Sequence, residues 1–201
     1  MASSKSPPAE KRRQILDAAV RVFAHQGFHA TRVSDIADEA GVAYGLVSHY
    51  FNSKEEVLNE LFVERWSLLI VAIEEADRAG GPHRDRLAAV AGFIIDSYRH
   101  DPELMKVIIV EVTRAANSFG QTHLTEIRRA YESIAKIVAD GQAAGEFRGD
   151  VPPIFASMAF YGAIEQLLSA WIFDVIPSSD AGFEEAKDLL VATICDGLAP
   201  R

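Results

Sequence analysis

Residues 41–51 have the sequence GVAYGLVSHYF and lie between SDIADEA (34–40) and NSKEEVL (52–58). The segment contains two glycines, three aromatic residues and no Asp, Glu, Lys or Arg. This pattern predicts two short helices, over 34–40 and 44–51, joined by a tight turn in which Gly41 supplies the backbone freedom. The arrangement is typical of a helix-turn-helix. An uncharged second helix suits a groove lined by phosphates, which would repel Asp or Glu.

The sequence on either side of this pair is also helical by its apolar spacing. The stretch from Glu10 to Gly27 places Ile15, Val22 and Phe23 on one face, with Gly27 as the expected C-cap. A capping box of Ser53 and Glu56 starts a long helix that continues past residue 70. Further helices are predicted over 83–99, 102–116, 120–144, 152–174 and 183–198, and we find no alternating strand pattern.

We therefore expect an all-α fold of about nine helices. A DNA-binding head is predicted over residues 9–69, with its helix-turn-helix motif at about 32–51. A helical body is predicted over residues 70–201. The chain of 201 residues, 49% of them hydrophobic, is long enough to build a core in each part.

Charge divides the chain in the same way. Residues 1–34 hold six basic and two acidic residues, a net charge of +4, whereas residues 57–201 hold thirteen basic and twenty-two acidic residues, a net charge of −9. A polyanion such as DNA should therefore be attracted to the N-terminal part and repelled by the rest.

Several classes of protein are disfavoured by the sequence. No apolar run is long enough to cross a membrane, and the N-terminus lacks the apolar segment of a secretory signal. Cys195 is the single cysteine, which fits a cytoplasmic protein without disulfides. The histidines show no metal-ligand spacing with cysteine or acidic residues. We expect no metal, no cofactor, no membrane partner and no enzymatic activity.

The recognition surface is predicted from the motif. Gly45 would let the helix backbone approach DNA, Leu46 would meet a thymine methyl group, and Lys54 would reach a phosphate. Arg32 stands where a helix N-cap is expected, so either Thr31 or Ser34 caps the helix and Arg32 clamps a phosphate instead. The full set of predicted DNA contacts is Arg32, Ser34, Tyr44, Gly45, Leu46, Ser48, His49, Tyr50 and Lys54.

The stretch RRQILDAAVRVFAHQGFHATRVSDIADEAGVAYGLVSHYFNSKEEVLNELF (12–62) resembles the DNA-binding head of the TetR family of bacterial transcriptional regulators. The shared features are the ILDAA opening, the IA…AGV turn and the G…YF…K ending. This resemblance implies a homodimer whose two recognition helices bind neighbouring major grooves of a near-palindromic operator. It also implies a body that binds a small effector and then releases the DNA.

The body resembles the acyl-CoA-responsive members that control fatty-acid degradation. The similarity lies in EVTRAANSF (111–119) and GAIEQLLSAWIFD (162–174). It implies a pocket for a long-chain acyl-CoA or fatty acid, with Arg114, and also Arg128 or Arg129, near the polar end of the ligand. The residues assigned to this pocket are Phe93, Met105, Ile108, Val112, Arg114, Asn117, Ile134, Phe160, Glu165 and Trp171. Each apolar member could equally be ordinary core, and Arg114 could be an ion-pair residue.

The last two predicted helices are expected to form the dimer face, as half of a four-helix bundle. The residues assigned to it are Phe155, Met158, Leu168, Ile172, Leu190 and Ile194.

One alternative function belongs to a different class: an all-α carrier or enzyme that holds a lipid and has no role on DNA. It requires paired carboxylates, a Cys/His pair or metal ligands that converge in the body, and the spacing of such residues indicates none. The sequence therefore predicts a DNA-binding transcriptional regulator, in the first instance a repressor.

Overall fold

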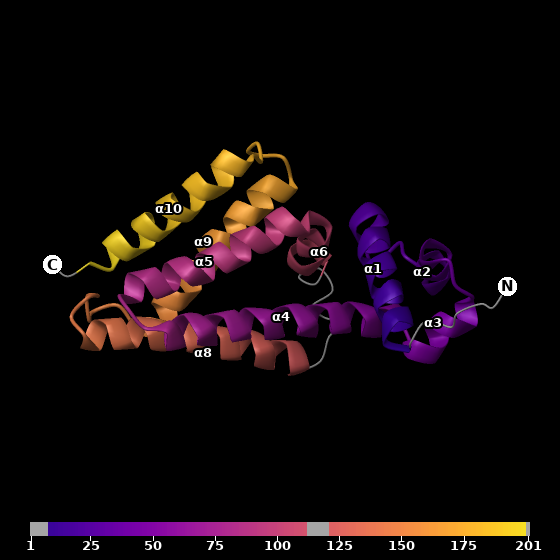
Figure 1. Cartoon of the computed structure of the whole chain (residues 1–201), viewed down its shortest axis with the longest axis horizontal. Coiled ribbons are helices and arrows are strands. Elements are labelled where there is room, and N and C mark those ends of the chain that lie inside the picture. Colours follow the sequence, from indigo (N-terminus) through magenta and orange to yellow (C-terminus); the bar gives the residue numbers. More distant parts are fainter. Residues whose placement is uncertain (1–7, 112–120, 200–201) are drawn as a thin grey trace. The chain divides into compact units, whose positions relative to one another are not determined.

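The computed structural model describes residues 8–111 and 121–199. Over these residues it contains nine α-helices, one short π-helical segment and no strand, which confirms the predicted all-α fold (Figure 1). The described chain forms two compact units. The first comprises residues 8–63 and 103–111, and the second comprises residues 64–102 and 121–199. The first unit thus combines residues of the predicted head with residues 103–111.

The first unit contains α1 (Pro8–Gln26), α2 (Val33–Ala40), α3 (Tyr44–Tyr50) and the beginning of α4 (Lys54–Ala79). Its core is formed by apolar side chains from all four helices, among them Ile15, Phe23, Ile36, Val47 and Phe62. The turn between α2 and α3 is as predicted. Gly41 has a φ of 63°, and its N–H donates to the carbonyl of Asp38.

Two further elements pack on α1 within this unit, namely α6 (Pro102–Lys106) and the π-helical η1 (Val107–Glu111). The Lys106 ammonium donates to the Ala24 carbonyl in the last turn of α1, at 2.8 Å. An α-helix was expected throughout residues 102–116. Instead, the α-helix gives way to a π-helix at four consecutive β-branched residues, 107–110, and β-branched side chains have a lowered preference for the α-helix.

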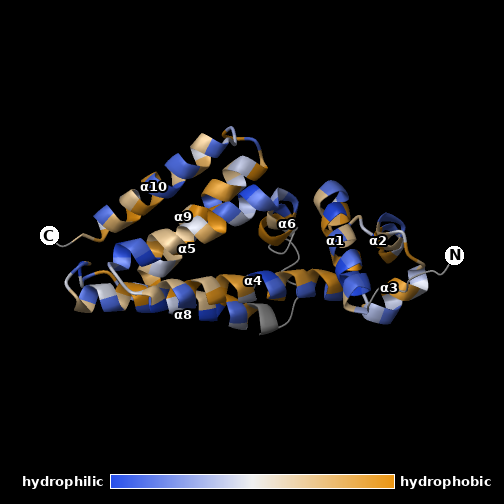
Figure 2. Cartoon of the chain, viewed as in Figure 1, coloured by the Kyte–Doolittle hydropathy of each residue, from blue (hydrophilic) through white to orange (hydrophobic). Residues whose placement is uncertain are grey.

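The second unit contains the rest of α4 together with α5 (His83–His100), α8 (Gln121–Ala143), α9 (Pro153–Ile172) and α10 (Asp180–Gly197). Helix α9 is apolar over most of its length (Figure 2), and it packs on α8 while α10 packs on α5. Ion pairs join α8 to α4: Arg129 with Glu74 at 2.9 Å and Lys136 with Asp77 at 2.8 Å. Arg129, one of the arginines considered for the effector, is thus paired with a carboxylate of its own unit.

Candidate functional site

Helix α3 has one buried face and one exposed face. Val47 is fully buried, and Phe51, just after the helix, is 2% exposed. Four predicted DNA contacts, Tyr44, Gly45, Ser48 and His49, are exposed, and Leu46 and Tyr50 are half-buried beside them. The two apolar anchors thus fix the helix so that it presents an uncharged polar surface to solvent.

Gly45 lies at an open position on that surface. A Cβ atom added there would have no heavy atom within 4 Å, apart from its immediate helical surroundings. The absence of a side chain is therefore not required by packing within the protein. Gly45 leaves the backbone of α3 accessible to an approaching surface.

The N-cap residue of α2 is neither Thr31 nor Ser34, the two residues expected from the sequence. Arg32 itself occupies the N-cap position, and its backbone N–H donates to the Asp35 carboxylate at 2.8 Å. That hydrogen bond is the main reason why the pKa of Asp35 lies below its usual value. Thr31 does not cap α2, since its hydroxyl accepts a hydrogen bond from the Gln26 side chain and donates one to the Gly27 carbonyl. The hydroxyl of Ser34 makes a long hydrogen bond of 3.4 Å to Asp35, and the Arg32 side chain is exposed.

The position of Lys54 favours a structural role over the predicted phosphate contact. Its ammonium group donates to the carbonyls of Phe28, His29 and Thr31 at 2.8, 3.1 and 2.8 Å. It also lies 4.6 Å from the centre of the Phe28 ring. An ammonium has three N–H groups, and all three are used here to hold the loop between α1 and α2.

The basic residues of α1 are similarly engaged within the head. Arg12 pairs with Glu60 at 2.9 Å, Arg13 pairs with Asp17 at 2.8 Å, and Arg21 pairs with Glu39. Acidic side chains of the head thus offset part of the positive charge counted over residues 1–34.

In the second unit, polar side chains from three helices form what we call the Arg65 cluster: Arg65 of α4, Tyr131 of α8, and Tyr161 and Glu165 of α9. The Tyr131 and Tyr161 rings meet edge to face with centroids 5.5 Å apart. The ring centroids of Trp66 and Tyr161 are also 5.5 Å apart. The Arg65 guanidinium lies 5.0 Å from the centre of the Phe93 ring.

The cluster is partly buried within the second unit. Burial raises the pKa of Tyr161 far above its usual range, and the neighbouring Glu165 adds to that effect. Burial also raises the pKa of Glu165 and lowers the pKa of the Arg65 guanidinium. Each member nevertheless keeps part of its surface accessible. The cluster is therefore a partly buried group of polar side chains that three helices bring together. The sequence analysis missed Arg65, Tyr131 and Tyr161, because residues so far apart in the chain give no common spacing.

The predicted effector residues are distributed as follows. Phe93 and Glu165 keep accessible surface, Glu165 within the Arg65 cluster and Phe93 against Arg65. Ile134 is 0% and Phe160 is 1% exposed, so both are packed core in this structure and line no open space. Met105 and Ile108 are buried and belong to the first unit. Val112, Arg114 and Asn117 lie outside the described residues.

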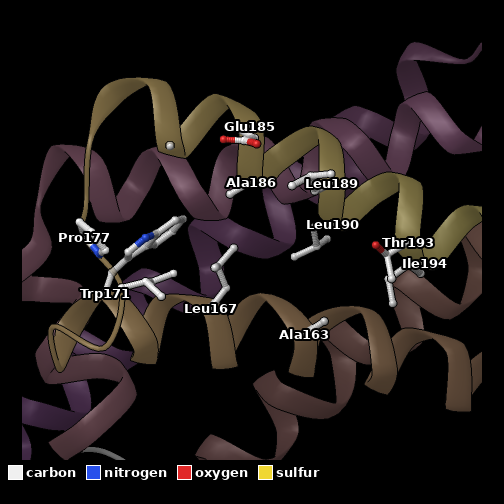
Figure 3. Close-up of a pocket in the computed structure, with 12 residues that line it drawn as sticks. Ala163, Leu167, Trp171, Pro177, Glu185, Ala186, Leu189, Leu190, Thr193 and Ile194 are labelled. Atoms are coloured by element: carbon white, nitrogen blue, oxygen red, sulfur yellow. The ribbon is translucent and has the colours of Figure 1, made fainter.

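An apolar groove of about 530 Å³ lies between α9 and α10 (Figure 3). Ala163, Leu167 and Trp171 line it from α9, and Leu189, Leu190 and Ile194 are among the residues that line it from α10. Trp171 was predicted to contact the effector. It stacks on Tyr98 with ring centroids 5.6 Å apart and meets Phe183 edge to face, so it forms part of the groove wall and not of the Arg65 cluster.

The predicted dimer residues differ in how far they are exposed. Phe155 is 64% and Met158 is 55% exposed, and Ile172 and Ile194 are half-buried, so these four leave apolar surface accessible to solvent. Leu190 is largely buried but still lines the groove. Leu168 is 1% exposed and belongs to the core of its own chain, so its assignment to the dimer face is corrected.

Two kinds of feature are absent from the part of the chain that the structure describes. No group of three or more His, Cys, Asp or Glu side chains is arranged to hold a metal ion there. Within the same residues, no helix has both the length and the apolar character needed to span a membrane.

The chain was compared with known proteins. It matches the family model described as bacterial regulatory proteins, tetR family, over residues 15–61, and the model described as tetracyclin repressor-like, C-terminal domain, over residues 84–194. A fatty acid metabolism regulator protein of Bacillus subtilis is 31% identical over 177 residues, which cover 85% of this chain and 91% of that protein.

Two solved structures are similar over nearly the whole chain. The fatty acid degradation regulator FadR from Bacillus halodurans gives a TM-score of 0.85 at 24% identity, with 99% of this chain and 100% of the other covered, which shows a shared fold. FadR from Bacillus subtilis in complex with stearoyl-CoA gives a TM-score of 0.82 at 25% identity, with 92% and 98% covered.

Proposed function

This chain belongs to the TetR family of bacterial regulatory proteins, and from that premise we propose that it is a homodimeric repressor released from its operator by a long-chain acyl-CoA. As a member of the family it is a DNA-binding transcriptional regulator. The exposed, uncharged face of α3 supports direct contact with DNA. Val47 and Phe51, both buried, fix the opposite face of this helix in the core.

DNA recognition is assigned to that face and to the start of α2. Tyr44, Ser48 and His49 would offer hydrogen-bonding groups to bases or phosphates, and Leu46 would contact a thymine methyl group. Tyr50 and Ser34 flank these residues. The exposed Arg32 would contact a phosphate beside the N-terminus of α2. Binding through such contacts weakens steeply as salt is raised.

The effector is assigned to the body. A relative with the same fold has been solved in complex with stearoyl-CoA, and the body of this chain contains the Arg65 cluster next to aromatic side chains. A polar cluster beside an apolar wall is the arrangement expected of a site for a ligand with a polar head and a hydrocarbon tail. The same relatives are transcriptional regulators, which supports the absence of an enzymatic role.

Release of the operator is assigned to α4. This helix is continuous from Lys54 to Ala79, and its residues divide between the two units at Val63 and Glu64. An effector that displaced its body portion would also reorient its head portion, and the spacing of the two recognition helices in a dimer would no longer match the operator. A coupling free energy of about 1–3 kcal/mol is enough for a substantial change in occupancy.

The dimer is assigned to the exposed apolar surface of α9 and α10. Phe155 and Met158 on α9, together with Leu189 on α10, would pack against the same residues of a second copy. The groove between the two helices would then be filled by the partner's side chains.

We expect stearoyl-CoA to raise the melting temperature of the purified protein. A ligand at one hundred times its Kd stabilises the folded state by about 2.7 kcal/mol. For a chain of this size that corresponds to a shift of about 5–10 °C. Differential scanning fluorimetry with stearoyl-CoA, and with free CoA as the control, measures it. The absence of a saturable shift specific to the acylated ligand would remove acyl-CoA as the effector.

A further inference from the structure

Two exposed histidines lie on the head, one on the proposed DNA-binding face and one beside it. His49 belongs to the exposed face of α3, and His29 lies in the loop between α1 and α2. His29 is not among the DNA contacts predicted from the sequence. Its ring meets the Phe28 ring edge to face with centroids 5.5 Å apart, and the His49 ring meets the Tyr50 ring in the same way at 5.2 Å. Each imidazole is thus supported by an aromatic neighbour while the residue stays exposed.

Lys54 holds the loop with His29 close to the end of α3. It begins α4, a few residues after α3, and its ammonium group donates to the carbonyl oxygens of His29 at 3.1 Å and of Phe28 and Thr31 at 2.8 Å. The same ammonium group lies 4.6 Å from the centre of the Phe28 ring, against which His29 packs. His49 lies in the last turn of α3. The loop is therefore fixed against the segment that directly follows the turn with His49.

Neither imidazole forms a hydrogen bond or an ion pair within the residues that the structure describes. The neighbouring carboxylates are those of α2 and of the first turn of α4, namely Asp35, Asp38, Glu39, Glu55 and Glu56. Three of these carboxylates accept hydrogen bonds from other residues, and none of the five forms an ion pair with either ring. Both imidazoles are therefore available to a partner outside the chain.

Much of the permanent positive charge around the two rings is engaged within the head. Lys54 uses its three N–H groups on the loop carbonyls, and Arg21 is paired with a carboxylate of α2. Arg32 is exposed, and Tyr44 and Tyr50 are the other titratable side chains of α3. A protonated imidazole would thus add positive charge to a surface on which Arg32 supplies exposed permanent charge.

Imidazole is the side chain that changes charge between pH 5 and 8, and a neighbouring anion favours its protonated form. DNA phosphates are such anions, and an imidazolium donates a strong, charge-assisted hydrogen bond to a phosphate oxygen. A histidine that meets a phosphate on binding therefore takes up a proton more readily in the complex than in the free protein. When the complex holds more protons than its free components, the affinity rises as the pH falls.

We propose that His29 contacts a phosphate of the operator, and that His29 and His49 take up protons when DNA binds, so that the operator is bound more tightly at pH 6 than at pH 8. This assignment rests on the proposed function, in which α3 and the start of α2 contact the operator. It adds a contact from the loop between α1 and α2, and it makes operator occupancy depend on pH as well as on an effector.

The test is the pH dependence of operator binding by the full chain. Fluorescence anisotropy measures the Kd for an operator duplex selected from a random library, at pH 6, 7 and 8 and constant ionic strength. The variants are His29→Gln, His49→Gln and the double variant, because glutamine stays polar and takes up no proton. His25→Gln is the matched control, since His25 is also exposed on the head but its imidazole lies 3.7 Å from the Glu103 carboxylate.

We expect the wild-type Kd to fall at least about tenfold from pH 8 to pH 6, because two histidines in each of two heads contribute to proton uptake. Each single variant should lose about half of this change on a logarithmic scale, and the double variant should retain less than about twofold. His25→Gln should keep the wild-type pH dependence.

Three results would overturn the proposal: a wild-type Kd that is the same at all three pH values, a full change in the double variant, or loss of the change in His25→Gln. A pH dependence that His49→Gln removes and His29→Gln leaves intact would remove His29 from the DNA contacts. A wild-type protein that selects no duplex at any pH would instead contradict the proposed function itself.

Discussion

Gly45→Ala is expected to weaken operator binding by at least about tenfold while stabilising the free protein. The added methyl group has open space around it in the free head, and alanine favours a helix over glycine by about 0.5–1 kcal/mol. In the complex the same methyl group would lie between the α3 backbone and the DNA. A loss of about 1.4 kcal/mol or more of contact free energy corresponds to the tenfold effect.

The measurement is fluorescence anisotropy on an operator selected from a random duplex library, together with a thermal melt of each variant. Gly92→Ala is the matched control, because Gly92 lies in α5 of the body and also has no heavy atom within 4 Å of an added Cβ. The control should stabilise the protein and leave DNA binding unchanged. Wild-type affinity of Gly45→Ala for the operator would show that α3 does not approach DNA closely at this position.

Leu189→Glu is expected to convert the protein to a monomer and to reduce operator affinity by about 10²- to 10⁴-fold. Leu189 is 59% exposed and lines the groove between α9 and α10, so the change leaves the core of the single chain intact. A charge there would be buried without a partner in the proposed dimer. In a dimer, binding of one head holds the second head at a high effective concentration near the other half-site. A monomer lacks this advantage, so its affinity for the operator is lower.

Sedimentation velocity and operator titration measure the two effects. Leu124→Glu is the control, because Leu124 on α8 is also 59% exposed and does not line the groove. If Leu189→Glu remains a dimer with full operator affinity, the dimer face lies elsewhere on the molecule.

Local patterns in the sequence were sufficient to predict most of the helices. The turn at Gly41, the buried Val47 and the start of α4 near Ser53 each follow from residues within a few positions of one another. The exposed face of α3 was predictable for the same reason, since one helical period decides which side chains lie opposite Val47.

Sequence patterns do not reveal which distant side chains or carbonyls a residue contacts. Lys54 has the residue type and position expected of a phosphate contact. In the structure its ammonium group donates three hydrogen bonds to carbonyls more than twenty residues earlier in the chain. Leu168 shares the apolar character of the dimer residues, and only the packing of the body shows that it is core. The packing of three helices brings the residues of the Arg65 cluster together, and no sequence motif indicates that they are neighbours.

We propose above all that an acyl-CoA releases this regulator from its operator. The most direct test is the Kd of the wild-type protein for the selected operator, measured by anisotropy with and without saturating stearoyl-CoA. We predict that the ligand raises this Kd at least about tenfold, within the usual range of allosteric coupling, and that free CoA does not. An operator Kd that stays the same at saturating stearoyl-CoA would contradict the account.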